Sequence, residues 1–160
     1  KHYKTGEVMP TGLIAKFQKA GTFDQAFATV EYLAAAMLDM DYHTQSKPIT
    51  MSAEKFEKES LDKIGLTGAI IPRYRSTYFT HVFSGGYAAG YYSYIWAAVL
   101  DADAFDAFKK TSLFNPELAK KFRTHILEKG GTEDSMILYN KFRGKDPEVK
   151  PLLIRRGLAL

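Results

Sequence analysis

Apolar residues recur three and four positions apart along most of this chain, which is the spacing of amphipathic helices. No segment shows the sustained polar and apolar alternation, bounded by turn pairs, that indicates β-strands. We therefore predict an all-α fold. No internal repeat or low-complexity tract interrupts the pattern, so the sequence predicts a single helical domain over residues 1–160.

Capping residues and helix breakers set the expected boundaries. Pro10 opens a first helix that Gly21 closes, and Thr22 with Gln25 resembles a capping box that starts a second helix. The expected helices are Pro10–Gly21, Thr22 to about His43, Ser52 to about Ile64, about Tyr87 to Lys110, Asn115 to Gly130, a helix from Thr132, and a short one from Asp146 that Pro151 disturbs. Residues 65–77 are expected to form a loop.

The helix expected from Tyr87 to Lys110 is predicted to be the most enclosed element. Its apolar residues lie on nearly all sides as far as Leu100. At about 100° per residue, Tyr87, Tyr91 and Tyr94 would fall within an arc of roughly 60°. Three phenol groups on one face suit a wet cleft, where a tyrosine donates a hydrogen bond to a carbonyl oxygen that becomes an oxyanion. The equal alternative is that these rings pack in the core.

Glycines and a histidine precede the tyrosines, in the run His-Val-Phe-Ser-Gly-Gly-Tyr that begins at His81. Gly85 and Gly86 have no side chain, so they allow a sharp turn and the close approach of a ligand or second segment. His81 is a candidate donor to a substrate oxygen, because an imidazole can donate a hydrogen bond in either tautomer or as the cation. The alternative for a lone histidine among aromatics is a structural role.

Three segments resemble the thimet oligopeptidase family of zinc peptidases, and within it the bacterial peptidyl-dipeptidases, which remove C-terminal dipeptides. The first is Arg73–Asp106, with the glycine and tyrosine motif. The second is Phe23–Asp41, which is similar to the family's helix after the metal-site region. The third is Gly130–Leu158, which contains Gly-Thr-Glu-Asp-Ser-Met and Pro-Leu-Leu-Ile-Arg-Arg-Gly-Leu. The resemblance therefore covers nearly the whole chain.

The resemblance implies a hydrolase that cleaves oligopeptides with zinc as cofactor. By position in the motif, Tyr94 is expected to be the principal oxyanion donor, with Tyr87 and His81 as catalytic partners on the substrate. Tyr91, Gly85 and Gly86 are expected to bind substrate. Whether the enzyme releases dipeptides or cleaves internally stays open, because the residues that close the cleft decide it.

The family's H-E-x-x-H zinc motif is absent from this sequence. The histidines at positions 2, 43, 81 and 125 are far apart, and there is no cysteine. We expect a C-terminal fragment that binds no metal and is inactive without the missing N-terminal part of the same chain. Glu31 is interpreted as a polar residue on a helix face, and His43 and His125 as solvent-exposed. A non-catalytic helical interaction module is the alternative.

Two arginines before the motif allow two interpretations. Arg73 and Arg75 either anchor a substrate carboxylate by bidentate contact or pair with acidic groups on a neighbouring helix. The sequence does not choose between them.

Charge and hydropathy exclude some partners. The formal net charge is +4, with residues 1–108 at −2 and residues 109–160 at +6. The basic residues of the second part are interleaved with acids and leucines, so a nucleic-acid interface is not expected. No apolar run approaches the roughly 20 residues that span a bilayer, so no membrane partner is expected either. We place the protein in the cytoplasm, with oligopeptides as its substrates.

Overall fold

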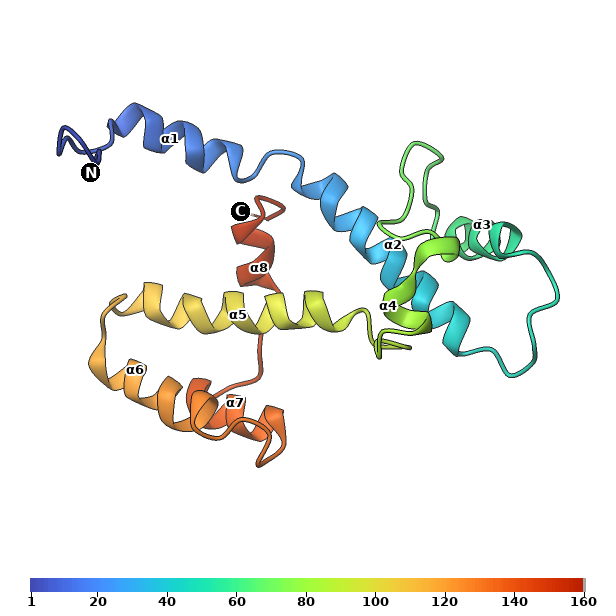
Figure 1. Ribbon diagram of the computed structural model, residues 1–160. Helices are drawn as coiled ribbons and strands as arrows, with labels where there is room; N and C mark the ends of the chain where they lie inside the picture. The colour runs from blue at the N-terminus through green and yellow to red at the C-terminus, as the bar shows by residue number, and fades with distance from the viewer. Residues whose placement is uncertain (160) are drawn as a thin grey trace. The chain divides into compact units, whose positions relative to one another are not determined.

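The computed structural model describes residues 1–159, and within them it contains helices and turns but no β-strand (Figure 1). The all-α prediction is confirmed. The elements are α1 (Thr11–Ala20), α2 (Gln25–His43), α3 (Ala53–Lys63), the 3₁₀ turn η1 (Ser76–Tyr78), α4 (Thr80–Phe83), α5 (Ser93–Lys110), α6 (Pro116–Phe122), the π-helical segment η2 (Arg123–Leu127), α7 (Ser135–Arg143) and α8 (Lys150–Arg155).

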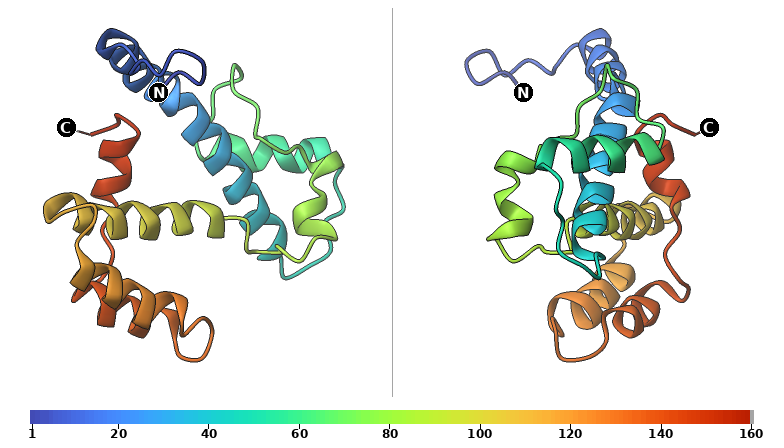
Figure 2. Two further views of the ribbon diagram at one scale, coloured as in Figure 1. Left: turned by 60° about the vertical axis from the view of Figure 1, so that its left-hand side comes forward. Right: turned by 90° about the vertical axis from the view of Figure 1, so that its right-hand side faces the viewer.

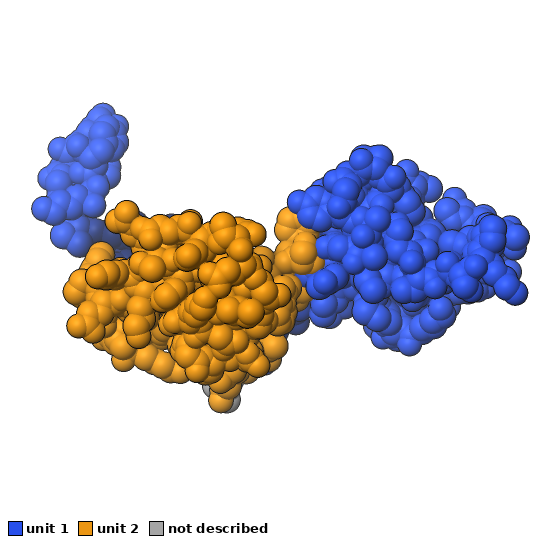
Figure 3. Space-filling model, turned by 90° about the horizontal axis from the view of Figure 1, so that it is seen from below, with its two compact units in different colours: residues 1–92, 156–158, 160 blue, residues 93–155, 159 orange. Residues whose placement is uncertain are grey.

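Packing groups the chain into two compact units. Unit 1 contains residues 1–92 and 156–158, and unit 2 contains residues 93–155 and 159 (Figure 3). That residues 1–160 form a single helical domain stays a prediction, because a division into two compact units does not decide whether they fold as one domain. The two units are described separately below.

Unit 1 is built around α2. Ala34, Ala35 and Leu38 on this helix have no exposed surface, and α3 packs against the helix (Figure 2). The small alanine side chains leave room for the segment after α3, so that Phe79 and Tyr91 enter the core beside Ala35. Close packing of this kind is the main source of stability in a small helical unit.

Unit 2 is built around α5. Val99 and Ala102 of α5 pack against Leu152 of α8, and α7 contributes the buried residues Leu138 and Phe142. The ring of Phe142 meets that of Phe122 on α6 edge to face, with centroids 5.2 Å apart. Such an edge-to-face pair adds stability beyond the area that it buries.

Several predicted helix boundaries are confirmed. Ser52 caps α3 by accepting a hydrogen bond from the Lys55 amide at 3.3 Å. The Asn115 side chain caps α6 by accepting from the amides of Glu117 and Leu118, both at 3.0 Å. Pro10, which was expected in the first turn, is the N-cap residue of α1, and the helix begins one residue later at Thr11.

The predicted capping box at the start of α2 is wrong. The Thr22 hydroxyl donates backward to the Lys19 carbonyl at 3.1 Å. Asp24 is the N-cap residue, with φ of 60° and no side-chain capping bond. The helix therefore begins after a left-handed residue and not after a side-chain cap.

The predicted helix from Tyr87 is also wrong, because α5 begins at Ser93. Gly86 and Ala89 have φ values of 83° and 53°, which a right-handed helix excludes. Nor is α5 the most enclosed element: Tyr94, Trp96 and Phe105 are exposed. On α2, by contrast, four residues have no exposed surface, namely Ala34, Ala35, Leu38 and Asp39.

The last two helices start later than predicted. Asp134 caps α7 by accepting from the Met136 amide at 2.9 Å, so the helix begins at Ser135 and not at Thr132. Pro151 lies in the first turn of α8, where proline removes no helical hydrogen bond. It therefore does not disturb that helix, which begins at Lys150 and not near Asp146.

Candidate functional site: a histidine and tyrosine turn

The turn after α4 depends on its two glycines. A Cβ atom added to Gly85 would lie 2.9 Å from both the Cα atom and the carbonyl oxygen of His81, closer than real Cβ contacts allow. Gly86 has a φ of 83°, which favours glycine. The predicted sharp turn is present, and it brings the backbone of Gly85 close to the backbone of His81. Substrate binding by the glycines stays a prediction.

This turn brings His81 and Tyr87 together. The Tyr87 amide donates to the His81 carbonyl at 3.0 Å, and the two ring centroids are 6.2 Å apart. His81 is half-buried, with its ring 4.7 Å from that of Tyr74, while Tyr87 remains 37% exposed. An imidazole and a phenol therefore lie side by side at the surface of unit 1. Both side chains have hydrogen-bonding atoms that suit a peptide backbone.

Tyr91 lies in the core of unit 1 rather than at its surface. It is 3% exposed and stacks on Tyr32, with ring centroids 5.1 Å apart. The Tyr32 hydroxyl donates a hydrogen bond to the Tyr91 carbonyl, and Phe79 meets the Tyr91 ring edge to face at 5.0 Å. The Tyr91 ring therefore packs in the core, which was the alternative to a position in a wet cleft. The predicted row of three phenols on one helix is wrong, because Tyr87 and Tyr91 precede α5.

Tyr94 belongs to unit 2. It is the second residue of α5 and is 44% exposed. Its position near the start of a helix gives its backbone a defined geometry. The structure thus brings His81, Gly85, Gly86, Tyr87 and Tyr91 together in unit 1, and places Tyr94 in the other unit.

Sequence reasoning missed Asp39 on α2. This side chain is completely buried, and it accepts hydrogen bonds from the amides of Ala89 at 3.0 Å and Tyr91 at 2.9 Å. His43 was expected to be exposed, but its Nδ1 atom lies 2.8 Å from the Asp39 carboxylate and its side chain is 24% exposed. The available signal was an acid on the apolar face of a helix, four residues before a histidine, because a buried carboxylate requires partners.

The two arginines near this turn differ in their contacts. Arg75 Nε donates to Glu57 Oε1 at 2.7 Å, and the Ser76 amide donates to Glu57 Oε2 at 2.7 Å. Of the two interpretations of Arg75, the ion pair with a neighbouring helix is therefore present. Arg73 is exposed, lies 5.9 Å from the centre of the Tyr74 ring, and has a pKa raised mainly by a hydrogen bond with that tyrosine.

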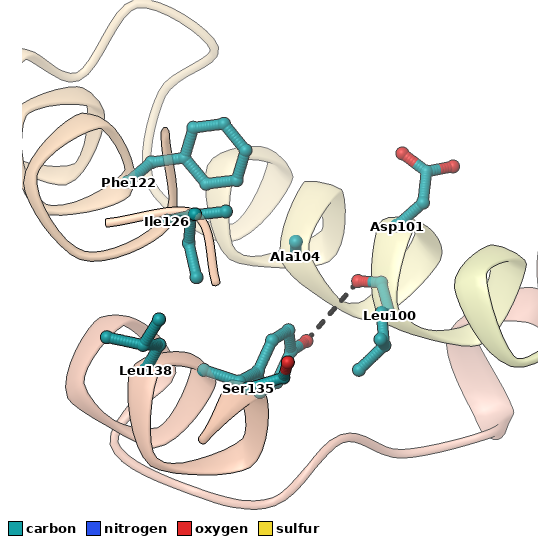
Figure 4. A pocket seen from close by; sticks show the side chains of 9 residues that line it. Leu100, Asp101, Ala104, Phe122, Ile126, Ser135 and Leu138 are labelled. Atoms are coloured by element: carbon teal, nitrogen blue, oxygen red, sulfur yellow. Dashed lines mark hydrogen bonds between the residues drawn. The ribbon is translucent and has the colours of Figure 1, made fainter. Parts of the chain in front are cut away.

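Unit 2 contains an apolar cavity of about 320 Å³ between α5, η2 and α7 (Figure 4). Leu100, Phe122, Ile126 and Leu138 point into it. Tyr139 also lines it, and its hydroxyl oxygen lies 3.3 Å from the Leu100 carbonyl oxygen. The lining offers packing surface and no group of acids and bases suited to hydrolysis.

Among residues 1–159, no group of three or more His, Cys, Asp or Glu side chains is arranged to hold a metal ion. Residues 1–159 therefore do not themselves form a zinc site. Among the same residues, no helix has the length and apolar character needed to cross a membrane.

The chain was compared with known proteins. The family model described as Peptidase family M3 matches residues 1–158. The chain is 40% identical to the dipeptidyl carboxypeptidase of Escherichia coli (strain K12), with 100% of this chain and 24% of that protein covered. It is 37% identical to oligopeptidase A of the same strain, with 98% and 23% covered. It is 36% identical to the probable cytosolic oligopeptidase A of Arabidopsis thaliana, with 99% and 23% covered.

The chain thus spans about a quarter of the length of the curated relatives that it matches. The match runs over the helix α2, the glycine turn and the closing segment, which are the three places where the sequence resembles a zinc peptidase family. That resemblance is confirmed: the chain belongs to Peptidase family M3.

Proposed function

We propose that this chain is part of a peptidyl-dipeptidase that hydrolyses oligopeptides near their C-terminus. The observation that carries the proposal is the family match over residues 1–158, together with 40% identity to a dipeptidyl carboxypeptidase. The substrates are oligopeptides, and the remainder of the same polypeptide is the chain's partner. A cytoplasmic location is part of the proposal; two Arabidopsis relatives of equal identity are named for different compartments, one cytosolic and one organellar.

In this proposal the surface formed by His81 and Tyr87 contacts the peptide backbone. Both side chains carry hydrogen-bond donors, and both are held by the short turn at Gly85 and Gly86. Tyr94 donates to the carbonyl oxygen as it becomes an oxyanion, because a donor aimed at that position before reaction stabilises the transition state most. Tyr91 contributes by filling the core beneath the turn, and the glycines keep the backbone accessible.

Zinc is the expected cofactor of the complete enzyme, as for the family. Since no metal-ligand group is present among residues 1–159, the metal would be held by residues elsewhere in the polypeptide. The metal would supply the activated water. The residues of this chain would orient the peptide and donate hydrogen bonds.

An endopeptidase is the second candidate. The 37% identity to oligopeptidase A is close to the 40% identity to dipeptidyl carboxypeptidase, so both relatives support a peptidase but favour different products.

Two matched peptides separate these candidates. The complete protein is incubated with an oligopeptide that has a free C-terminus and with the same peptide amidated, and the products are identified by mass spectrometry. A peptidyl-dipeptidase releases dipeptides from the first and spares the second. Internal cleavage of both peptides at equal rates would favour the endopeptidase, and no cleavage of either would reject a peptidase function.

A further inference from the structure

A buried carboxylate outside the proposed catalytic residues holds the turn at residues 87–91. Asp39 Oδ1 accepts from the Ala89 amide at 3.0 Å, and Asp39 Oδ2 accepts from the Tyr91 amide at 2.9 Å. Each oxygen therefore binds a different backbone group of the turn, which lies about fifty residues later in the chain. Because Asp39 has no exposed surface, water does not replace these bonds.

The turn needs this support because its backbone is unfavourable. Ala89 has a φ of 53°, in the left-handed region where a Cβ atom is crowded. One of the two Asp39 bonds goes to the amide of this strained residue. His43 lies one helical turn after Asp39, and its Nδ1 atom is 2.8 Å from Asp39 Oδ1 and 2.9 Å from the Asp39 carbonyl oxygen.

Backbone bonds connect the turn to the His81 surface. The Gly90 amide donates to the Tyr87 carbonyl at 2.8 Å, and the Tyr87 amide donates to the His81 carbonyl at 3.0 Å. A shift of the turn at Ala89 therefore displaces Tyr87, and with it the contact to His81. These bonds form a continuous path from Asp39 to the residues proposed to touch substrate.

We propose that Asp39 is a positioning residue of the peptidase: its carboxylate fixes the turn that carries Tyr87 and so aims the His81 and Tyr87 surface at the peptide. The inference rests on the proposed function, in which that surface contacts substrate. Displacement of reacting groups by about 1 Å costs on the order of 10²-fold in rate, so the loss of this support should be visible in turnover.

The test uses Asp39→Asn in the complete protein. The side-chain amide keeps one acceptor oxygen and replaces the other by an NH₂ group, which accepts no hydrogen bond, so one of the two backbone amides loses its partner. We expect kcat to fall about 10- to 100-fold, with KM within about threefold of the parent value. Hydrogen exchange in the peptide 84–92 should become at least about tenfold faster, because the turn opens more often.

Asp41→Asn is the matched control. Asp41 lies on the same helix, but its carboxylate is 3.6 Å from Lys63 Nζ. This variant should resemble the parent in both turnover and exchange. If Asp39→Asn prevents folding, the double variant Asp39→Asn/Ala89→Gly is used, because glycine relieves the left-handed strain at position 89 while one acceptor oxygen of residue 39 stays absent. The lower kcat and the faster exchange in the peptide 84–92 are expected for this variant too.

Unchanged exchange in the peptide 84–92 would overturn the inference, whatever the turnover. The inference would also be overturned if Asp39→Asn speeds exchange without changing kcat while Tyr87→Phe lowers kcat. In that case the Tyr87 hydroxyl would matter for turnover, but the bonds from Asp39 to the turn would not. If Tyr87→Phe and Tyr94→Phe also leave kcat unchanged, the proposed function fails, and the catalytic part of this inference fails with it.

Discussion

The carboxylate of Asp103 accepts two hydrogen bonds from the guanidinium of Arg143, one from Nε at 2.8 Å and one from an Nη atom at 3.1 Å. The Tyr139 hydroxyl donates a third at 2.6 Å. Asp103 lies on α5 and its two donors lie on α7, so this network connects α5 to α7 within unit 2. Bidentate arginine pairs have a fixed geometry, which fits a structural role.

The first prediction concerns the stability of this network. Asp103→Ala should lower the free energy of unfolding by about 3 kcal/mol, because it leaves a largely buried arginine without its partner. Chemical denaturation of the parent and the variant measures the difference. Asp101→Ala is the matched control on the same helix: its carboxylate pairs with Arg155 and is 68% exposed, so its loss should cost less than about 1 kcal/mol. Equal costs for the two variants would contradict the buried network.

The second prediction concerns pH. Burial raises the pKa of the Asp103 carboxyl, but the hydrogen bonds from Arg143 and Tyr139 outweigh this effect and hold the pKa below its ordinary value. The stabilisation is therefore complete above the unfolded pKa of about 4 and is lost as the pH falls further, through the folded pKa. Unfolding free energies measured between pH 7 and pH 2 should show the parent approaching Asp103→Asn at the acidic end. A gap that stays constant with pH would contradict this assignment.

The third prediction concerns Tyr94. In the complete enzyme, Tyr94→Phe should lower kcat about 10²- to 10³-fold with a much smaller rise in KM, because an oxyanion donor acts mainly in the transition state. Steady-state kinetics on one oligopeptide gives both constants. Tyr92→Phe serves as the control, since Tyr92 is an exposed neighbour outside the proposed machinery. An unchanged kcat in Tyr94→Phe would remove this residue from the mechanism.

The fourth prediction concerns Gly85. Gly85→Ala should destabilise the protein by about 1–3 kcal/mol, because the added Cβ atom meets the backbone of His81 and the turn must shift. Thermal unfolding checks the stability, and near-ultraviolet circular dichroism reports the nearby tyrosines. Gly68→Ala is the control, since nothing lies within 4 Å of a Cβ atom at that glycine. A fully stable Gly85→Ala variant would show that the turn adapts freely.

Much of the fold is predictable from local signals in the sequence. Ser52 and Asn115 cap their helices through side-chain bonds to amides a few residues away, so the residue types alone predict the boundaries. The helical spacing of apolar residues likewise predicts the helix α2 and the buried positions Ala34 and Leu38, although Phe27, Val30 and Met37 of the same pattern are exposed. These features depend on neighbours in the sequence, which explains why they were found.

The errors arise where distant residues decide the structure. The segment from Tyr87 to Tyr92 has helical spacing, yet Asp39 binds the amides of Ala89 and Tyr91 and holds a turn there. The competing tertiary contact outweighs local helix propensity. The same contact moves Tyr91 into the core, so its candidate role in binding substrate could not be judged from spacing. Asp39 itself was overlooked because nothing in the sequence connects it to a turn fifty residues away.

The most direct test of the account measures turnover of one oligopeptide with a free C-terminus by the complete protein and by its Tyr87→Phe/Tyr94→Phe double variant. The account predicts release of C-terminal dipeptides by the parent, and a loss of at least about 100-fold in kcat in the double variant. Equal turnover by the two proteins, or no hydrolysis by the parent, would contradict it.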